Sequence, residues 1–183
     1  MSILSTNPPA LLLGSVALAG GPAQPLAFIA GSKLAYFRSG HFIPQLVPTG
    51  TGLRAWLFAA IRAVNPAFPV TPELVGSVTE NTKALEQYLS GANREFLTSL
   101  VSKLLNSAHT LDLKRWTIGV DLTADRAGFV LANDLPRSLA VIRATPDDVA
   151  PLPAKDRIRE LISYAISDEY FHLRQRLGIS IAS

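Results

Sequence analysis

The sequence predicts a mainly α-helical fold, a compact multi-helix domain with one or two short strands near its N-terminus. Three observations lead to this fold class. Apolar side chains recur at the i, i+3, i+4 spacing of a helix along most of the chain. Glycine and proline turns separate these stretches. At 183 residues, with 48% hydrophobic and 17% charged residues, the chain is long and apolar enough to bury a sizeable core.

The N-terminal part contains the element around which the others should pack. Residues 10–15 are a short apolar run that we expect to form a strand, followed by a Gly-Gly-Pro turn at 20–22. The stretch 26–41 is apolar on nearly every side, which predicts a helix in the middle of the fold, and Pro25 suits its first turn. An alternative, that residues 11–19 belong to a signal peptide, is disfavoured because no Lys or Arg precedes them.

The same spacing predicts the remaining helices, at residues 51–64, 71–90, 93–107, 112–132, 136–144 and 155–177. The segment 71–90 is polar enough to be mostly a surface element. The segment 93–107 carries a firm apolar side, formed by Phe96, Leu97, Leu100, Val101, Leu104 and Leu105. In 112–132 the inward positions are Leu113, Trp116, Val120, Ala124, Ala127 and Leu131. Residues 145–153 read as a proline-rich loop, and Gly178 as a left-handed helix cap.

Composition disfavours several classes of function. The 17 basic and 14 acidic residues are spread along the chain without a basic block, so we expect no nucleic-acid partner. The absence of cysteine excludes disulfides and thiolate metal sites and fits a reducing, cytoplasmic setting. There is no run of 18 apolar residues, and we therefore expect no transmembrane segment.

Two segments carry the pattern of a catalytic site whose reactive residues have been replaced. They read Ala-Gly-Ser-Lys-Leu-Ala-Tyr-Phe-Arg-Ser-Gly-His at 30–41 and Val-Asp-Leu-Thr-Ala-Asp-Arg-Ala-Gly at 120–128. Together they resemble the zinc-binding helices of gluzincin metallopeptidases of the HtpX and CAAX-prenyl-protease type. In such peptidases the two histidines of His-Glu-x-x-His bind zinc, the glutamate is the general base, and a second helix supplies a carboxylate ligand.

The resemblance implies a role for each vestigial position. Ser32 stands at the first histidine ligand, Lys33 at the general base and Tyr36 at the second ligand. In this family the motif continues to a further histidine five residues after the second ligand, a place that His41 holds. Its third ligand is the glutamate of Glu-x-x-Ala-Asp, where Asp121 replaces the glutamate and Ala-Asp-Arg at 124–126, which contains Asp125, matches. An ammonium or a tyrosine hydroxyl is no zinc ligand at neutral pH. The resemblance therefore implies a pseudopeptidase with a zincin-like helical core and without catalytic residues, bound metal or cofactor.

This interpretation sets the expected domain organisation. We expect one domain over residues 1–183, with a strand and turn segment at 1–22, a pseudopeptidase helical core at 23–135 and C-terminal helices packing on it at 136–183. Related peptidases carry strands ahead of the first motif helix, and almost none fit here. This leaves open that the chain is the C-terminal part of a longer protein.

A carboxylate that has lost its metal needs a new partner. An isolated buried charge costs several kcal/mol, so we predict that Lys33 or the Tyr36 hydroxyl pairs with Asp121 and fixes how the two helices meet. Gly119 and Gly128 flank Asp121, and in a helix they indicate close approach of a neighbouring helix and, more weakly, room for a ligand.

The predicted function is non-catalytic: a pseudopeptidase domain for protein–protein interaction or a structural module of a larger assembly. The alternative is a divergent metallohydrolase or another hydrolase using the same cleft. A third class, a membrane-surface binder, needs a basic amphipathic face that the last helix shows only in part. A Ser32–Lys33 dyad is disfavoured because adjacent helix positions point apart. The histidines, including His109 and His172, show no ligand spacing.

Overall fold

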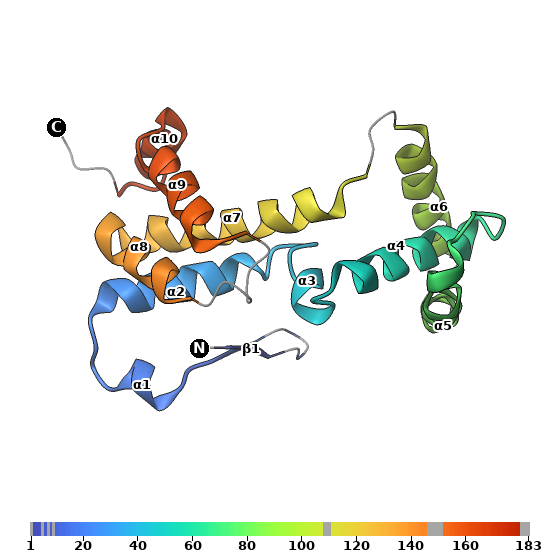
Figure 1. The fold of residues 1–183 in the computed structure, drawn as a ribbon, viewed down its shortest axis with the longest axis horizontal. Helices are drawn as coiled ribbons and strands as arrows, with labels where there is room; N and C mark the ends of the chain where they lie inside the picture. The colour runs from blue at the N-terminus through green and yellow to red at the C-terminus, as the bar shows by residue number, and fades with distance from the viewer. Residues whose placement is uncertain are drawn as a thin grey trace. The chain divides into compact units, whose positions relative to one another are not determined.

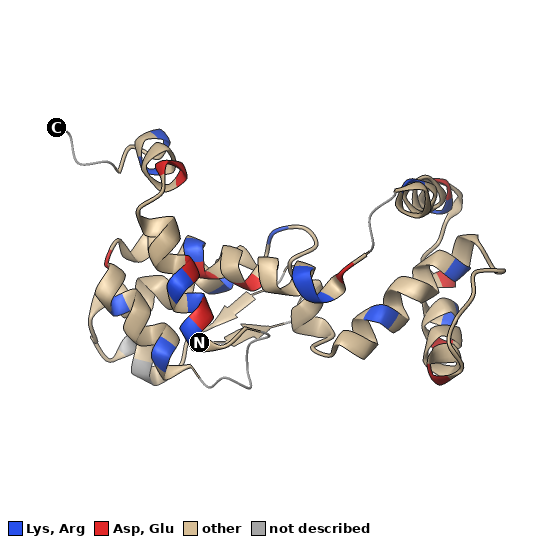
Figure 2. Cartoon of the chain, turned by 45° about the horizontal axis from the view of Figure 1, so that its top comes forward, with Lys and Arg blue, Asp and Glu red and all other residues tan. Residues whose placement is uncertain are grey.

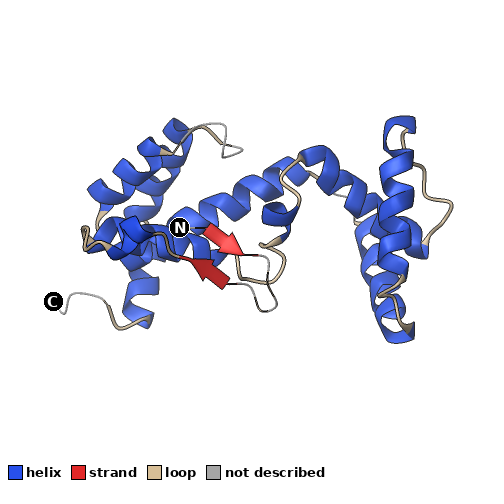
Figure 3. Ribbon diagram, turned by 90° about the horizontal axis from the view of Figure 1, so that it is seen from below, coloured by secondary structure: helices blue, strands red, loops and turns tan. Residues whose placement is uncertain are grey.

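The computed structural model describes residues 2–4, 6, 8, 10–107, 111–145 and 152–179. Their structure is mainly helical with two short strands, as the sequence predicts (Figures 1 and 3). The chain divides into two compact units, a first unit of residues 1–46 and 114–183 and a second unit of residues 47–113. His109 and most of the predicted proline-rich loop lie outside the described residues. The single-domain organisation stays a prediction.

The first unit contains a small hairpin and most of the helices. Strands β1 (Ser2–Leu4) and β2 (Ala10–Leu12) pair antiparallel, with Ile3 opposite Leu11. The helices of this unit are α1 (Ser15–Leu18), α2 (Ala23–Ala35), α3 (Ile43–Leu46), α7 (Leu113–Ala132), α8 (Leu135–Ala144), α9 (Ala154–Ala165) and α10 (Asp168–Arg176). The predicted strand at 10–15 is therefore shorter than expected, because Ser15 already begins α1.

The second unit is built on α4 (Gly50–Val64), against which α5 (Val75–Glu86) and α6 (Gly91–Asn106) pack. The short 3₁₀ helix η1 (Pro72–Leu74) precedes α5. The side chain of Thr49 caps α4 by accepting a hydrogen bond from the backbone N–H of Gly52 at 3.1 Å. The Arg94 guanidinium ties α6 to the end of α4 by donating to the Ala63 carbonyl oxygen at 2.8 Å.

Helix α2 is shorter and less enclosed than predicted. It ends at Ala35 instead of near His41, because the backbone tightens into a turn in which the Arg38 N–H donates to the Ala35 carbonyl at 3.3 Å. Gly40 then takes a left-handed φ of +81°. The expected burial on nearly every side is also wrong. Phe28 is 3% exposed but Leu34 is 48% exposed.

The predicted last helix is broken into two helices. Helix α9 ends at Ala165, and α10 begins after Ser167, whose hydroxyl accepts a hydrogen bond from the Tyr170 N–H at 3.3 Å. The acidic residues Asp168 and Glu169 follow in the first turn of α10, where they favour a helix N-terminus. Gly178 has a φ of +68°, which confirms the predicted left-handed cap.

The apolar faces agree with the prediction only in part. In α6 the predicted apolar side is mostly open: Val101 is buried, whereas Phe96 and Leu100 are exposed. The reason is that, among the elements described in the second unit, α6 packs mainly on α4. In α7 the predicted inward residues Val120 and Ala124 are buried, but Trp116 and Leu131 reach the surface. Helix α5 is mostly exposed, as predicted.

The core of the first unit lies where α2, α7, α8, α9 and α10 meet. The rings of Phe129 and Tyr170 stack with centroids 4.8 Å apart, and Tyr164 meets Tyr170 edge-on at 5.4 Å. Arg174 closes this corner by donating to the side-chain oxygen of Asn133, the left-handed residue that follows α7. In the described part of the chain, no helix is both long and apolar enough to cross a membrane.

Candidate functional site

The two motif segments lie against each other on α2 and α7, which touch through glycine. A Cβ atom on Gly128 would lie 2.5 Å from the Phe28 carbonyl oxygen, and one on Gly31 would lie 2.9 Å from the Ala127 carbonyl oxygen. The backbones therefore meet with no room for a side chain, which confirms the close approach predicted at Gly128. At Gly119 the prediction is wrong, because no described atom outside its own helix lies within 4 Å of an added Cβ.

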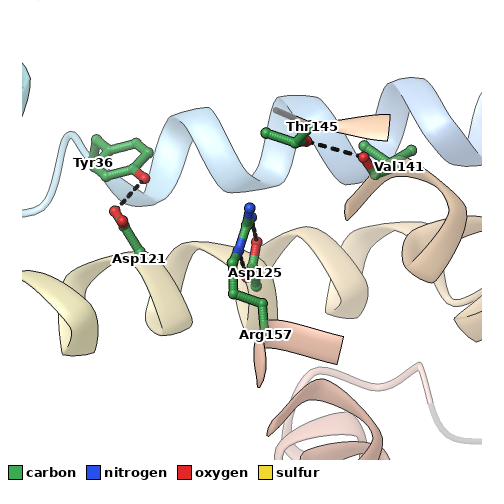
Figure 4. Close-up of polar contacts among 6 residues, drawn as sticks. All are labelled: Tyr36, Asp121, Asp125, Val141, Thr145 and Arg157. Carbon is green, nitrogen blue, oxygen red and sulfur yellow. Dashed lines mark hydrogen bonds and ion pairs between the residues drawn. The ribbon is translucent and has the colours of Figure 1, made fainter. Parts of the chain in front are cut away.

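The Tyr36 hydroxyl donates a hydrogen bond to Oδ1 of Asp121 at 2.7 Å (Figure 4). This contact confirms the predicted pairing of Asp121 with Tyr36. Tyr36 is 9% exposed and packs with Val120 and Ala124. Because Tyr36 meets Asp121 while the earlier residue Phe28 meets the later Gly128, α2 and α7 run antiparallel.

One turn further along α7, Asp125 is held by Arg157 of α9. The Arg157 Nε donates to Oδ2 at 2.9 Å and Nη2 donates to Oδ1 at 2.6 Å, a bidentate pair that Figure 4 shows between the helices. The side chains of Asp125 and Arg157 are 4% and 11% exposed. Sequence reasoning missed Arg157. The available signal was the i, i+4 spacing of Asp121 and Asp125. Two carboxylates on one buried face repel each other, so a cation nearby is expected to stabilise them.

Burial governs the proton affinities of this cluster. It raises the pKa of Asp121 above the ordinary value, although the Tyr36 hydrogen bond and the charge of Arg157 act in the opposite direction. Burial likewise raises the pKa of Asp125 against the effect of Arg157. Burial and the neighbouring Asp121 charge raise the pKa of Tyr36, so its hydroxyl keeps its proton and acts as a donor.

The other vestigial positions lie near the crossing or beyond it. The Ser32 hydroxyl is buried against Gly128 and has no hydrogen-bond partner among the described residues. Lys33 places its Nζ 5.8 Å from the centre of the Tyr36 ring, and its charge lowers the pKa of Asp121 slightly against burial. His41 lies in the turn after α2, where burial and the charge of Arg38 lower its pKa.

The arrangement is suited to joining helices. Tyr36 and Asp121 link α2 to α7, and Asp125 and Arg157 link α7 to α9. The side chains at the three expected ligand positions are a hydroxyl, a phenol and a carboxylate, a poor set for zinc, and an ammonium stands at the position of the general base. Within the described ranges, no group of three or more His, Cys, Asp or Glu side chains could hold a metal ion.

Figure 2 shows basic and acidic residues on the helices of both units, although the charged residues of α4 are basic alone. Comparison with models of protein families, with curated proteins and with solved structures finds no match for this chain. The resemblance to zinc peptidases thus remains a prediction that rests on the motif residues themselves.

Proposed function

We propose that the chain is a non-catalytic helical module, a degenerate relative of the peptidases it resembles, that serves protein–protein interaction or forms a structural piece of a larger assembly. The observation that carries the proposal is the 2.7 Å hydrogen bond from Tyr36 to Asp121. It engages the carboxylate that would stand as third zinc ligand. A phenol that keeps its proton is a hydrogen-bond donor here, so the pair replaces a metal centre with a helix clamp.

The second buried pair supports the same assignment. A carboxylate that served as general base would have to reach a substrate. The side chain of Asp125 is instead 4% exposed, and both of its oxygens accept hydrogen bonds from Arg157. A buried ion pair adds little net stability over an apolar contact, but it penalises every arrangement that separates its partners. Such a pair is suited to fixing the positions of α7 and α9 in a framework.

Exposed apolar side chains support the interaction part of the proposal. On α6, Phe96 and Leu100 are 67% and 46% exposed and stand four residues apart, which places them on one face of the helix. Single exposed apolar residues are normal on a protein surface. A helix face with large apolar residues at helical spacing is instead the arrangement by which amphipathic helices meet partners.

Metal analysis of the purified full chain tests the non-catalytic assignment. Protein expressed with added zinc and purified without chelators should contain far less than one zinc per chain by mass spectrometry of the element. Two variants serve as a matched pair: Asp121→Ala at the proposed clamp and Asp168→Ala at an exposed carboxylate of α10. Stoichiometric zinc that is lost in Asp121→Ala and kept in Asp168→Ala would support the divergent metallohydrolase instead.

Removal of the Tyr36 hydroxyl tests the clamp itself. Tyr36→Phe leaves the Asp121 carboxylate without its donor, which should lower the free energy of unfolding by about 1–3 kcal/mol. The control is Tyr88→Phe, at a side chain that is 77% exposed, where the change should stay within about 0.5 kcal/mol. Urea unfolding followed by circular dichroism measures both. Equal stability of the two variants would rule out a clamp.

A further inference from the structure

A groove of about 570 Å³ opens in the first unit between α2, α7, α9 and α10. This volume is typical of small-molecule sites. Gly31, Leu34 and Ala35 of α2 line the groove, together with Arg38 from the turn that follows this helix. The paired side chains Tyr36, Asp121, Asp125 and Arg157 are not among the residues that line it. The groove is therefore a separate site from the clamp.

Two arginines, Arg38 and Arg126, line this groove, and neither is paired with an acidic side chain among the described residues. The Arg126 guanidinium lies 4.9 Å from the centre of the Tyr164 ring, and its Nε is buried without an acceptor. In the described part of the chain, neither Arg126 nor Arg38 forms an ion pair. Arg157, by contrast, has an acidic partner, because its guanidinium donates two hydrogen bonds to a carboxylate of the same unit.

The charge of the groove favours one negative group. Its charged lining consists of Arg38, Arg126 and Glu169, which leaves one net positive charge. Glu169 is on α10, so it repels an anion from that side and favours the side of Arg126 on α7 and of Arg38 in the turn after α2. A guanidinium is suited to a planar carboxylate, which it can bind with two parallel hydrogen bonds.

The rest of the lining is apolar. Leu34 of α2 and Leu131 of α7 are 48% and 57% exposed, and Val130 and Leu173 add to the apolar lining. Exposed leucines on two helices that face the same groove offer a surface for methylene groups. We propose that the groove binds an amphipathic monocarboxylate, a medium-chain fatty acid, with its carboxylate at Arg126 and its chain along Leu34, Leu131 and Leu173.

Calorimetric titration of the full chain with sodium decanoate, below its micelle concentration, tests the proposal. Decanoate should bind saturably with one site per chain. Propionate has the carboxylate without the chain, and decyltrimethylammonium has the chain with the opposite charge, so both should fail to bind at the same concentrations. Amide shifts in ¹H–¹⁵N spectra should map decanoate to the groove helices α2, α7 and α10. The result is independent of the zinc content.

Variants identify the groups that bind. Arg126→Gln should weaken decanoate binding roughly tenfold or more, because a charge-assisted hydrogen bond is lost. Leu131→Asp should abolish it, whereas Leu177→Asp, at a leucine that is 54% exposed and outside the groove, should not. The exposed Arg38→Gln provides a second charge variant should Arg126→Gln fail to fold by circular dichroism.

Several outcomes would overturn the proposal. They are an absence of saturable decanoate binding, equal binding of decyltrimethylammonium, or equal weakening by Leu131→Asp and Leu177→Asp. A parallel sedimentation assay uses phosphatidylcholine vesicles with and without oleate. If the chain binds oleate vesicles but not free decanoate, the chain recognises a membrane surface and the assignment of the groove to a single fatty acid is wrong.

Discussion

Replacing Arg157 by methionine tests how strongly the buried ion pair holds α9 onto α7. Methionine keeps most of the length of the side chain and removes its charge, so Asp125 stays buried without a cation. The two side chains are 4% and 11% exposed and share hydrogen bonds of 2.6 and 2.9 Å. Breaking a buried pair by removing one partner costs about 3–5 kcal/mol. We expect Arg157→Met to lower the free energy of unfolding by about 4 kcal/mol on that basis.

The assay is urea unfolding followed by tryptophan fluorescence. The chain has two tryptophans, Trp56 and Trp116. They lie one in each unit, so a Trp56→Phe background leaves a reporter of the first unit. With a slope of about 2 kcal/mol per molar urea, a loss of about 4 kcal/mol lowers the midpoint by about 2 M.

A matched control lies two residues further along α9. Arg159 pairs with Asp156 at 3.3 Å, but the side chains are 70% and 36% exposed. Arg159→Met should therefore change the free energy of unfolding by only about 0–1 kcal/mol. The double variant Asp125→Leu with Arg157→Met should regain most of the loss, because no buried charge remains. The reasoning fails if Arg157→Met costs no more than Arg159→Met, or if the double variant is less stable than Arg157→Met alone.

Two further predictions concern α7. Gly128→Ala places a Cβ 2.5 Å from the Phe28 carbonyl oxygen and should lower the free energy of unfolding by about 1–3 kcal/mol. Gly119→Ala, with open space around it, should raise it by about 0.5–1 kcal/mol. Thermal unfolding measures both variants, and changes of the same sign would contradict the glycine contact. Burial raises the pKa of Asp121, so the folded state holds this proton more tightly than the unfolded state, and the resulting stability is present below the ordinary pKa of about 4 and lost as pH rises through the raised pKa. In urea unfolding at a series of pH values, the wild type should thus gain stability relative to Asp121→Asn as the pH falls from about 7 toward about 4, a window set by the direction of the pKa shift. A difference between the two proteins that is flat or reversed would exclude a raised pKa.

The helices were predictable where local signals dominate. Helix α4 follows the predicted range closely because its apolar spacing and its proline and glycine boundaries agree. The break between α9 and α10 was missed, although Ser167 followed by two acidic residues is a helix-start signature. Apolar periodicity continued through the break and outweighed this signal. The exposure of Phe96 on α6 depends on which helices pack nearby, and spacing alone does not contain that information.

The part of the candidate site that could be predicted is the pairing of a buried carboxylate with a donor on the neighbouring motif helix. A carboxylate expected in a buried helix needed a donor, and Tyr36 on the neighbouring motif helix supplies it. Arg157 stands 32 residues after Asp125, on a helix with its own polar face, and no local pattern joins the two. The pairing of the groove arginines was equally unpredictable, because Arg38 and Arg126 are 88 residues apart in sequence and line one groove only in the folded chain. Long-range pairing therefore required the tertiary structure.

The corner closed by Arg174 determines how the last helix is ordered. Helix α10 has nine residues, too few to persist alone in water. Its attachment depends on Arg174, which reaches Asn133 and the carbonyl oxygen of Ile179, and on Tyr170, which stacks on Phe129. The helix is therefore ordered by a few side chains at this corner, and removing either Arg174 or Tyr170 should loosen the whole of α10. Because Glu169 and Leu173 belong to α10, loosening this helix would also remove its part of the groove lining.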